Sequence, residues 1–252
     1  MAEPGVVVVT GAAGGIGQAV CRRYVGSGYR VVGLDIDGAG LAALGDAVEQ
    51  VTVDLTDAET ADRVVSELGD IDVLIHCAGI TSLGPFGETP PAAFDRVLAV
   101  NLRSAVTATR AALPGLIAAG GRIGVLSSVS GFSPLLYRTA YAASKHALHG
   151  FFESLRAELV DEGVTVTMIC PSFVETGIEE RAVHRGSGIS GTWTTTGKVI
   201  STDHLADLIY RAMDRRARLV LPGATARLAY VLSRLSPALY ERTMRRRIGR
   251  SE

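Results

Sequence analysis

Short apolar runs alternate along the chain with longer stretches that have helical periodicity. The first run, GVVVVT at residues 5–10, has no polar alternation, which predicts a strand buried on both faces of a parallel sheet. Similar runs predict strands at residues 30–35, 51–54, 72–76, 121–127, 164–170 and 219–221. Amphipathic stretches predict helices at residues 18–27, 94–118, 141–160 and 203–216. The alternation predicts an α/β fold, a doubly wound parallel sheet of seven strands with right-handed crossovers and helices on both faces.

The composition fits one globular domain over residues 1–252. Hydrophobic residues make up 47% of the chain and charged residues 20%, which is enough apolar material for a sizeable core. The net charge of −1 argues against nucleic acid as a partner. The three cysteines are scattered without metal-ligand spacing, so we expect reduced core cysteines, no metal and a cytoplasmic protein. We find no signal peptide pattern and no stretch long enough to span a membrane.

A glycine-rich turn follows the first predicted strand. It reads TGAAGGIG over residues 10–17 and precedes a predicted helix. Glycines let the backbone approach a pyrophosphate closely, and the start of a helix supplies free N–H groups and a positive dipole end. The turn therefore predicts a dinucleotide site that includes Gly11, Gly14, Gly15, Ile16 and Gly17.

An acidic residue closes the second predicted strand. Asp35 lies 18 residues after Gly17, where a carboxylate can accept hydrogen bonds from both hydroxyls of an adenosine ribose. A carboxylate there repels a 2′-phosphate, and Gly14 offers no cation to receive one. The sequence therefore favours NAD over NADP, with Ile36 beside the same ribose. Asp37 is the poorer candidate because it is already in the loop.

The ends of later strands supply further contacts to a cofactor. We expect a further set of residues to lie against the adenine ring, the cofactor backbone and the nicotinamide. The residues are Asp54, Leu55, Cys77, Ala78, Gly79, Pro171, Val174 and Thr176. Thr56, with Glu59 three residues later, predicts a capping box at the start of the next helix.

A tyrosine and a lysine predict the chemical centre. Tyr141 and Lys145 are four residues apart and share one face if residue 141 opens a helix. A nearby ammonium favours the phenolate, since an opposite charge lowers the pKa of an acid. Ser128 closes the fifth predicted strand, at the edge where parallel sheets bind ligands. We expect no catalytic role for His146 and His149.

Asn101 lies inside the helical pattern of residues 94–118 and has two interpretations. Its side chain is bonded to neighbouring backbone, or its backbone carbonyl holds a water near Lys145. The sequence does not separate these interpretations.

Two segments have no fixed assignment from the pattern. Residues 178–200 are rich in Gly, Ser and Thr and predict a substrate loop, in which Trp193 covers the substrate or anchors the loop. Residues 224–252 alternate apolar residues with arginines and predict a basic helical extension. This extension packs on the domain or on a partner subunit, or makes a weak peripheral contact with a membrane; we favour packing.

These motifs, in this order and spacing, resemble the short-chain dehydrogenase/reductase family in its compact single-domain form. The resemblance covers residues 5–222, and it implies a Rossmann-like sheet with strand order 3-2-1-4-5-6-7. It implies hydride transfer between NAD and an alcohol or ketone, with Tyr141 as the general acid or base. Ser128 binds the substrate oxygen, Lys145 lowers the pKa of Tyr141 and holds the nicotinamide ribose, and Asn101 supports a water chain to Lys145.

The chain departs from the family pattern at two turns. His76-Cys77-Ala78-Gly79 stands where the family often has Asn-Asn-Ala-Gly, so that turn must be held in another way. Pro171-Ser172 stands where the family has Pro-Gly. Neither departure touches the proton-transfer residues.

The expected substrate is a hydrophobic, secondary alcohol or its ketone, because Leu135, Leu136 and Phe173 lie in segments near the site. The family commonly forms dimers or tetramers, so we expect a homodimer or homotetramer. Two alternatives remain: a 3-oxoacyl-thioester reductase that uses NADPH, which Asp35 argues against, and a regulator on the same fold that senses NAD without turnover.

Overall fold

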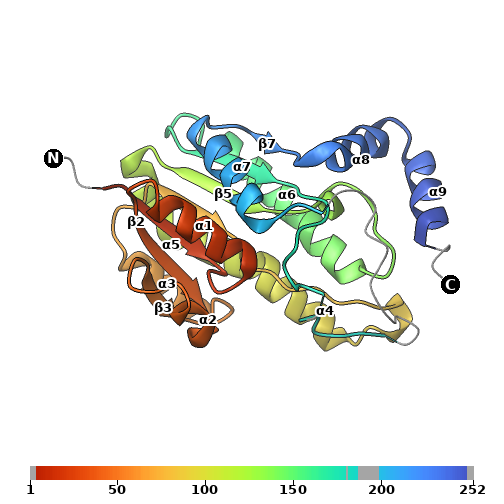
Figure 1. The fold of residues 1–252 in the computed structure, drawn as a ribbon, viewed down its shortest axis with the longest axis horizontal. Helices are drawn as coiled ribbons and strands as arrows, with labels where there is room; N and C mark the ends of the chain where they lie inside the picture. The colour runs from red at the N-terminus through yellow and green to blue at the C-terminus, as the bar shows by residue number, and fades with distance from the viewer. Residues whose placement is uncertain (1–3, 180, 187–198, 249–252) are drawn as a thin grey trace.

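The computed structural model describes residues 4–179, 181–186 and 199–248 (Figure 1). Its centre is a sheet of seven parallel strands in the order β3-β2-β1-β4-β5-β6-β7, which confirms the predicted fold and strand order. The strands are β1 Val6–Thr10, β2 Arg30–Asp35, β3 Glu49–Thr52, β4 Val73–His76, β5 Arg122–Leu126, β6 Thr165–Ile169 and β7 Leu219–Val220.

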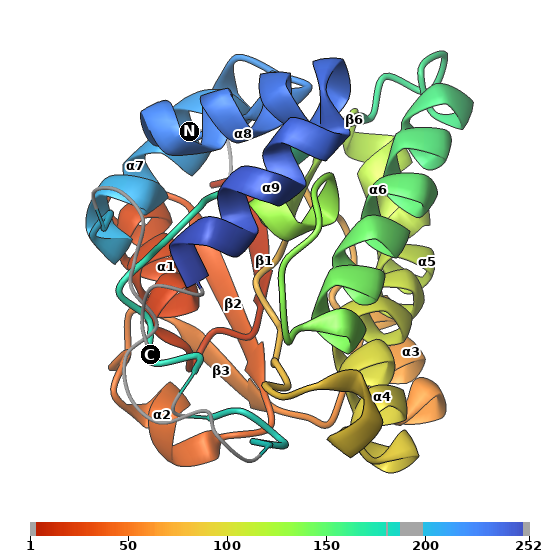
Figure 2. The same cartoon turned by 90° about the vertical axis from the view of Figure 1, so that its right-hand side faces the viewer.

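Helices cover both faces of the sheet (Figure 2). They are α1 Gly15–Val25, α2 Gly38–Ala42, α3 Ala58–Ser66, α4 Pro91–Leu98, α5 Ser104–Ala119, α6 Thr139–Glu158, α7 Thr202–Asp214, α8 Gly223–Leu235 and α9 Pro237–Ile248. Short helical turns lie at η1 Phe86–Glu88, η2 Ala99–Arg103 and η3 Val129–Gly131. Helices α1 and α7 pack on one face of the sheet, and α3, α5 and α6 on the other.

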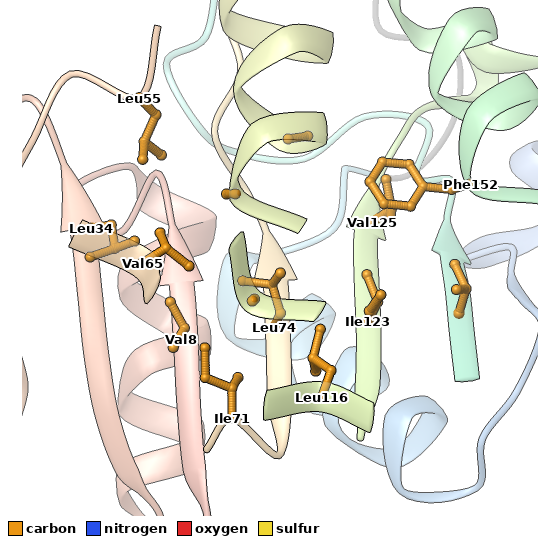
Figure 3. Packing of buried hydrophobic residues seen from close by; sticks show 14 of the residues in the cluster. Val8, Leu34, Leu55, Val65, Ile71, Leu74, Leu116, Ile123, Val125 and Phe152 are labelled. Carbon is orange, nitrogen blue, oxygen red and sulfur yellow. The ribbon is translucent and has the colours of Figure 1, made fainter. Parts of the chain in front are cut away.

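The two faces of the sheet form two cores because side chains alternate along each strand. Val7 and Val9 of β1 belong to the core under α1 and α7, whereas Val8 belongs to the opposite core. Figure 3 shows this second core, in which Val8, Leu74 and Ile123 of neighbouring strands lie on the same face as Leu116 of α5. These strands are buried on both sides, as their continuous apolar runs predict.

Two local predictions were wrong. The helix expected over residues 94–118 is divided by η2, a π-helical turn that separates α4 from α5. The capping box of Thr56 and Glu59 does not form: Asp57 is the N-cap of α3 and accepts from the N–H of Thr60, while Thr56 donates its hydroxyl to Asp54 at 2.7 Å. The helix thus begins one residue later than predicted, with a carboxylate instead of a hydroxyl as its N-cap.

The C-terminal extension forms the two helices α8 and α9, which are separated by Ser236. Pro237 starts α9, since proline is tolerated in the first turn of a helix but not in the interior. Helix α9 crosses in front of the carboxyl ends of the strands (Figure 2). Among the described residues, no helix combines the length and apolar character needed to cross a bilayer.

Candidate active site

A cavity of about 920 Å³ opens at the carboxyl ends of the strands. Parallel α/β sheets bind ligands at this edge, because the loops that leave the strands surround it. The cavity is lined by every predicted site residue except Asn101, namely Gly11, Gly14, Gly15, Ile16, Gly17, Asp35, Ile36, Asp54, Leu55, Cys77, Ala78, Gly79, Ser128, Tyr141, Lys145, Pro171, Val174 and Thr176. The fold thus brings together residues from six loops.

The glycine turn between β1 and α1 depends on the absence of side chains at two positions. Gly11 has φ +69°, and a Cβ there would lie 2.5 Å from the backbone nitrogen of Ala78. A Cβ at Gly17 would lie 2.1 Å from the carbonyl oxygen of Gly11. No side chain caps the start of α1 at Gly14, so its first N–H groups face the cavity without a side-chain acceptor. Such a helix start is a ready anion site.

Asp35 is fixed beside this turn. Its Oδ2 accepts from the N–H of Ala13 at 3.0 Å, and its Oδ1 accepts from the N–H of Asp37 at 3.0 Å. These bonds hold the carboxylate at the end of β2, where it lines the cavity. Asp37 lines the same cavity, but its carboxylate caps α2 by accepting from the N–H of Gly40.

Thr10 holds the turn after β4, a role that we did not predict. The N–H of Cys77 donates to the Thr10 carbonyl at 3.0 Å, and the N–H of Ala78 approaches the Thr10 hydroxyl at 3.4 Å. Both bonds use the backbone of the turn, so they do not need an Asn side chain at residue 77. The hydroxyl of Thr10, at the end of an otherwise apolar strand, was the available signal.

Ser128, Tyr141 and Lys145 converge on the cavity from β5 and α6. The Lys145 ammonium lies 5.6 Å from the centre of the Tyr141 ring and donates to the carbonyl of Leu126 at 2.7 Å. Ser128 Oγ accepts from the N–H of Ser130 at 3.1 Å, which orients the hydroxyl at the start of η3. The helical spacing of residues 141 and 145 is as the sequence predicts, since α6 spans both.

Burial is the main influence on both ionisable groups. It raises the pKa of the Tyr141 hydroxyl, and the charge of Arg138 and a hydrogen bond with Ser128 oppose it. Burial also lowers the pKa of the Lys145 ammonium to about 8. The expected depression of the Tyr141 pKa by Lys145 is therefore not what this chain shows: the direction is upward, and the cation that opposes it is Arg138.

Asn101 lies in η2 and its side chain bonds to distant backbone. Its Oδ1 accepts from the N–H of Ile80 at 2.8 Å, and its Nδ2 donates to the Ile80 carbonyl at 3.0 Å and to Ser144 Oγ at 2.9 Å. These bonds fix the loop after β4 against α6. A Cβ at Gly79 would lie 3.6 Å from both Asn101 Oδ1 and Lys145 Nζ, an ordinary contact distance, so Gly79 lies directly beside both groups. The water near Lys145 stays a prediction.

A partly buried ion pair at the edge of the cavity was missed. The guanidinium of Arg138, just before α6, bonds to Glu179, whose segment follows β6. The Arg138 side chain is 10% exposed and that of Glu179 is 35% exposed. The pair joins the helix that carries Tyr141 to the predicted substrate loop. No sequence signal identified Glu179 as the partner, because the contact spans 41 residues.

The outer wall of the cavity is apolar. Leu135, Leu136 and Phe173 line it, as we expected. The sequence did not indicate that the C-terminal extension contributes as well, with Thr225, Leu228, Ala229, Leu232, Tyr240, Thr243 and Met244. Ser133 Oγ donates to Tyr240 Oη at 3.0 Å and joins α9 to the segment after η3.

Other predicted residues lie apart from this wall or outside the described chain. The predicted substrate loop covers residues 178–200. Of these, residues 180 and 187–198, which include Trp193, lie outside the described residues. His149 bonds to Glu153 at 2.9 Å and packs edge-on against Phe132, and His146 bonds to the carbonyl of Ala142. Neither histidine is among the described residues that line the cavity.

Comparisons with known proteins agree with this geometry. The chain matches the short chain dehydrogenase family over residues 5–185. It is 35% identical over 268 residues to "Probable oxidoreductase EphD" of Mycobacterium tuberculosis, which covers 96% of this chain and 45% of that protein. It is 33% identical over 259 residues to "Dehydrogenase/reductase SDR family member 7B" of Bos taurus, which covers 95% of this chain and 80% of that protein. The chain thus spans about half the length of the mycobacterial relative.

A solved structure shows the same fold. The crystal structure of a short-chain dehydrogenase from Burkholderia cenocepacia in complex with NADP superimposes with a TM-score of 0.83 at 25% identity, covering 97% of this chain and 99% of that chain. The family match covers more than half of the sequence, and the bovine relative matches over most of its own length. The chain belongs to the short-chain dehydrogenase/reductase family of oxidoreductases.

Proposed function

We propose that the protein is an NAD-dependent oxidoreductase that interconverts a hydrophobic secondary alcohol and its ketone. One observation carries the proposal: Ser128, Tyr141 and Lys145 line the same cavity as Asp35, and an apolar wall lies beside them. Proton-handling groups, a ribose ligand and an apolar substrate surface are the parts that such a reaction needs. A homodimer or homotetramer belongs to the same proposal.

The residues present fit a dinucleotide. The uncapped start of α1 and the close backbone contacts of Gly11 and Gly17 suit a pyrophosphate, which a side chain at either glycine would disturb. Asp35 suits the adenosine ribose, and the backbone at Gly79 suits the nicotinamide ribose beside Lys145. NAD supplies hydride transfer at C4 of its nicotinamide and, when oxidised, adds a positive charge to the site.

Tyr141 moves the proton in this proposal. Its hydroxyl gives a proton to the substrate oxygen in ketone reduction and accepts one in alcohol oxidation. Burial favours the neutral hydroxyl, whereas Arg138 and the hydrogen bond with Ser128 favour the phenolate. Ser128 fixes the substrate oxygen relative to Tyr141, and Lys145 holds the nicotinamide ribose. Asn101 positions the loop that lies against Lys145.

The preference for NAD rests on this chain's own residues. The relative from Burkholderia cenocepacia was solved with NADP, so family membership does not decide the cofactor. Here the Asp35 carboxylate is held by two backbone N–H groups at the end of β2. The 2′-phosphate of NADP would be repelled by this carboxylate, which supports NAD as the cofactor.

The test is turnover by the purified chain and by Tyr141→Phe. We expect the chain to reduce NAD⁺ with apolar secondary alcohols, followed by NADH absorbance. The variant should lose about 10²–10⁴-fold in kcat, the usual contribution of general acid–base catalysis. Its dissociation constant for NAD⁺, measured by titration, should not change. A variant with unaltered kcat would exclude Tyr141 as the acid or base, and tight NAD⁺ binding without turnover of any alcohol would favour a sensor.

A further inference from the structure

Helix α8 carries an apolar stripe that is largely exposed. Leu228, Val231 and Leu235 are 63%, 51% and 81% exposed, and their spacing of three and four residues places them on one face. Ala226 and Ala229, which are 0% and 8% exposed, lie on the opposite side and pack inward. Side chains on the core side of a surface helix are normally the apolar ones. The outward leucines therefore have no role in the core.

The extension that carries this stripe is rich in arginine. Residues 224–252 contain seven arginines and two glutamates, although the whole chain carries a net charge of −1. In the described part of the extension, Arg227, Arg242, Arg245 and Arg246 are exposed. Glu241 forms an ion pair with Arg245 on the same helix, with 3.9 Å between Glu241 Oε1 and Arg245 Nη1. The outer surface of α8 and α9 thus combines exposed leucines with an excess of positive charge.

The combination of exposed leucines and arginines favours one kind of binding partner for α8 and α9. A second copy of the chain docked through the same face would bring the two arginine clusters together, and their repulsion would oppose the contact. An anionic bilayer complements both features, because its headgroups attract arginine and its acyl boundary accepts leucine. Leu235, the most exposed of these leucines, has its side chain outside the cavity lining, so it is free for such a contact.

We propose that α8 and α9 form a docking surface for an anionic membrane, with the α8 leucines in the headgroup boundary and the α9 arginines on lipid phosphates. Leu228 belongs to both the docking surface and the cavity wall, and Leu232 and Met244 continue that wall inward. Docking would place the mouth of the cavity against the bilayer. An apolar substrate would then enter from the lipid, a consequence that rests on the proposed function.

The test is co-sedimentation of the full chain with phosphatidylcholine vesicles, with and without phosphatidylglycerol, and it needs no substrate. We expect binding only when phosphatidylglycerol is present, and weakening as salt is added. Arg242→Gln with Arg246→Gln should weaken binding about thirtyfold, since each arginine near an anionic surface contributes about a factor of five. Leu235→Ser should weaken it about tenfold or more. None of these residues lines the cavity, so turnover in solution should not change.

Matched controls separate docking from general effects. Arg63→Gln with Arg215→Gln removes the same charge from exposed positions on other elements, and Val160→Ser replaces a 68% exposed apolar residue outside the extension. These controls should bind vesicles as the wild type does. The proposal is overturned if the wild type ignores phosphatidylglycerol, or if test and control variants bind equally. It is also overturned if Leu235→Ser converts a dimer into a monomer, measured by light scattering, and leaves vesicle binding unchanged.

Discussion

At the scale of single residues, Asp35 sets the cofactor preference in our proposal. We expect the wild type to bind NAD⁺ more tightly than NADP⁺, and Asp35→Ala to reduce this preference about tenfold or more. The reason is that a charged hydrogen bond to the ribose contributes about 1.5–3 kcal/mol, and the repulsion of a 2′-phosphate disappears with the carboxylate. Titration of both cofactors into both proteins measures the effect.

Asp37→Ala is the matched control. Its carboxylate caps α2 and is fixed by no bond to the glycine turn, so the ratio of the two affinities should stay as in the wild type. A wild type that prefers NADP⁺ would contradict the assignment of Asp35. It would favour the alternative function, a 3-oxoacyl-thioester reductase that uses NADPH.

His76 gives the fold a specific sensitivity to acid. The side chain is buried at the end of β4, where Nε2 lies 2.8 Å from Thr109 Oγ1 and Nδ1 has no hydrogen-bond partner. Burial lowers its pKa from 6.5 to about 3. Between these values the unfolded chain binds a proton that the folded chain excludes, so stability falls as the pH drops below 6.5.

We expect His76→Asn to remove this part of the pH dependence. From pH 6.5 to about pH 4.5 the wild type should lose about 2–3 kcal/mol more unfolding free energy than the variant. Urea unfolding of both proteins across this range measures the difference, in which the shared carboxylate effects cancel. Parallel curves for the two proteins would show that His76 titrates normally in the folded chain.

Individual site residues were the most predictable part of the molecule. Gly11, Asp35, Tyr141 and Lys145 are constrained by local geometry, a turn or a helical spacing, which the sequence displays directly. Thr10 was missed because its role consists of bonds to residues 77 and 78, on a strand that neighbours its own only after folding.

At the scale of elements, the ion pair of Arg138 and Glu179 joins α6 to the segment after β6. We expect a double-mutant cycle with Arg138→Gln and Glu179→Gln to give a coupling energy of about 1–3 kcal/mol. The reason is that removing either partner leaves a largely buried charge or polar group without its counterpart. Urea unfolding of the four proteins provides the free energies.

The exposed pair of Arg30 and Glu49 is the control cycle. It has a distance of 2.6 Å, but both side chains are about half exposed, at 48% and 46%. Its coupling should stay below about 1 kcal/mol, as is usual for surface pairs. Equal coupling in the two cycles would mean that the burial of Arg138 has no energetic consequence.

Secondary-structure elements were predicted well where the spacing of apolar residues stayed constant along the segment. Most strands and α6 follow from their apolar patterns. The exception among the strands is β3, which was expected over residues 51–54 but lies at Glu49–Thr52 with mostly exposed residues. Residues 94–118 continue a helical pattern through η2 without a visible break in the sequence. The π-helical turn is stabilised by the bonds of Asn101 to Ile80 and Ser144, which are tertiary contacts. The hydrophobic periodicity of residues 94–118 contains no information about these tertiary contacts, so the π-helical turn could not be predicted from it.

At the scale of the whole molecule, the C-terminal extension shapes the substrate end of the cavity. We expect Met244→Ala to raise KM about fivefold or more for long apolar alcohols and to leave KM for short ones unchanged. Loss of contact with about one or two methylene equivalents, at about 0.8 kcal/mol each, accounts for this size. Steady-state kinetics over a series of chain lengths gives the comparison.

Leu239→Ala is the control, because Leu239 lies on the same helix, is 51% exposed and does not line the described cavity. It should change KM for neither class of alcohol. A uniform rise of KM across the series for Met244→Ala would indicate displacement of α9 rather than loss of a local contact.

The arrangement of the sheet was predictable because parallel α/β topology allows few alternatives. The position of α8 and α9 was not. Their apolar and basic residues predict helices, but only the packing of Ala226 and Ala229 and the bond between Tyr240 and Ser133 decide which side faces the cavity.

The close approach of Gly11 to Ala78 has a consequence for the order of events in folding. These residues belong to turns after different strands, and they meet only once β1 and β4 are paired. Closing such a long stretch of chain is entropically costly and slow. The glycine turn therefore takes its final shape only in a chain in which β1 and β4 are already paired. A cofactor that binds only the folded chain therefore slows unfolding and leaves the rate of folding unchanged.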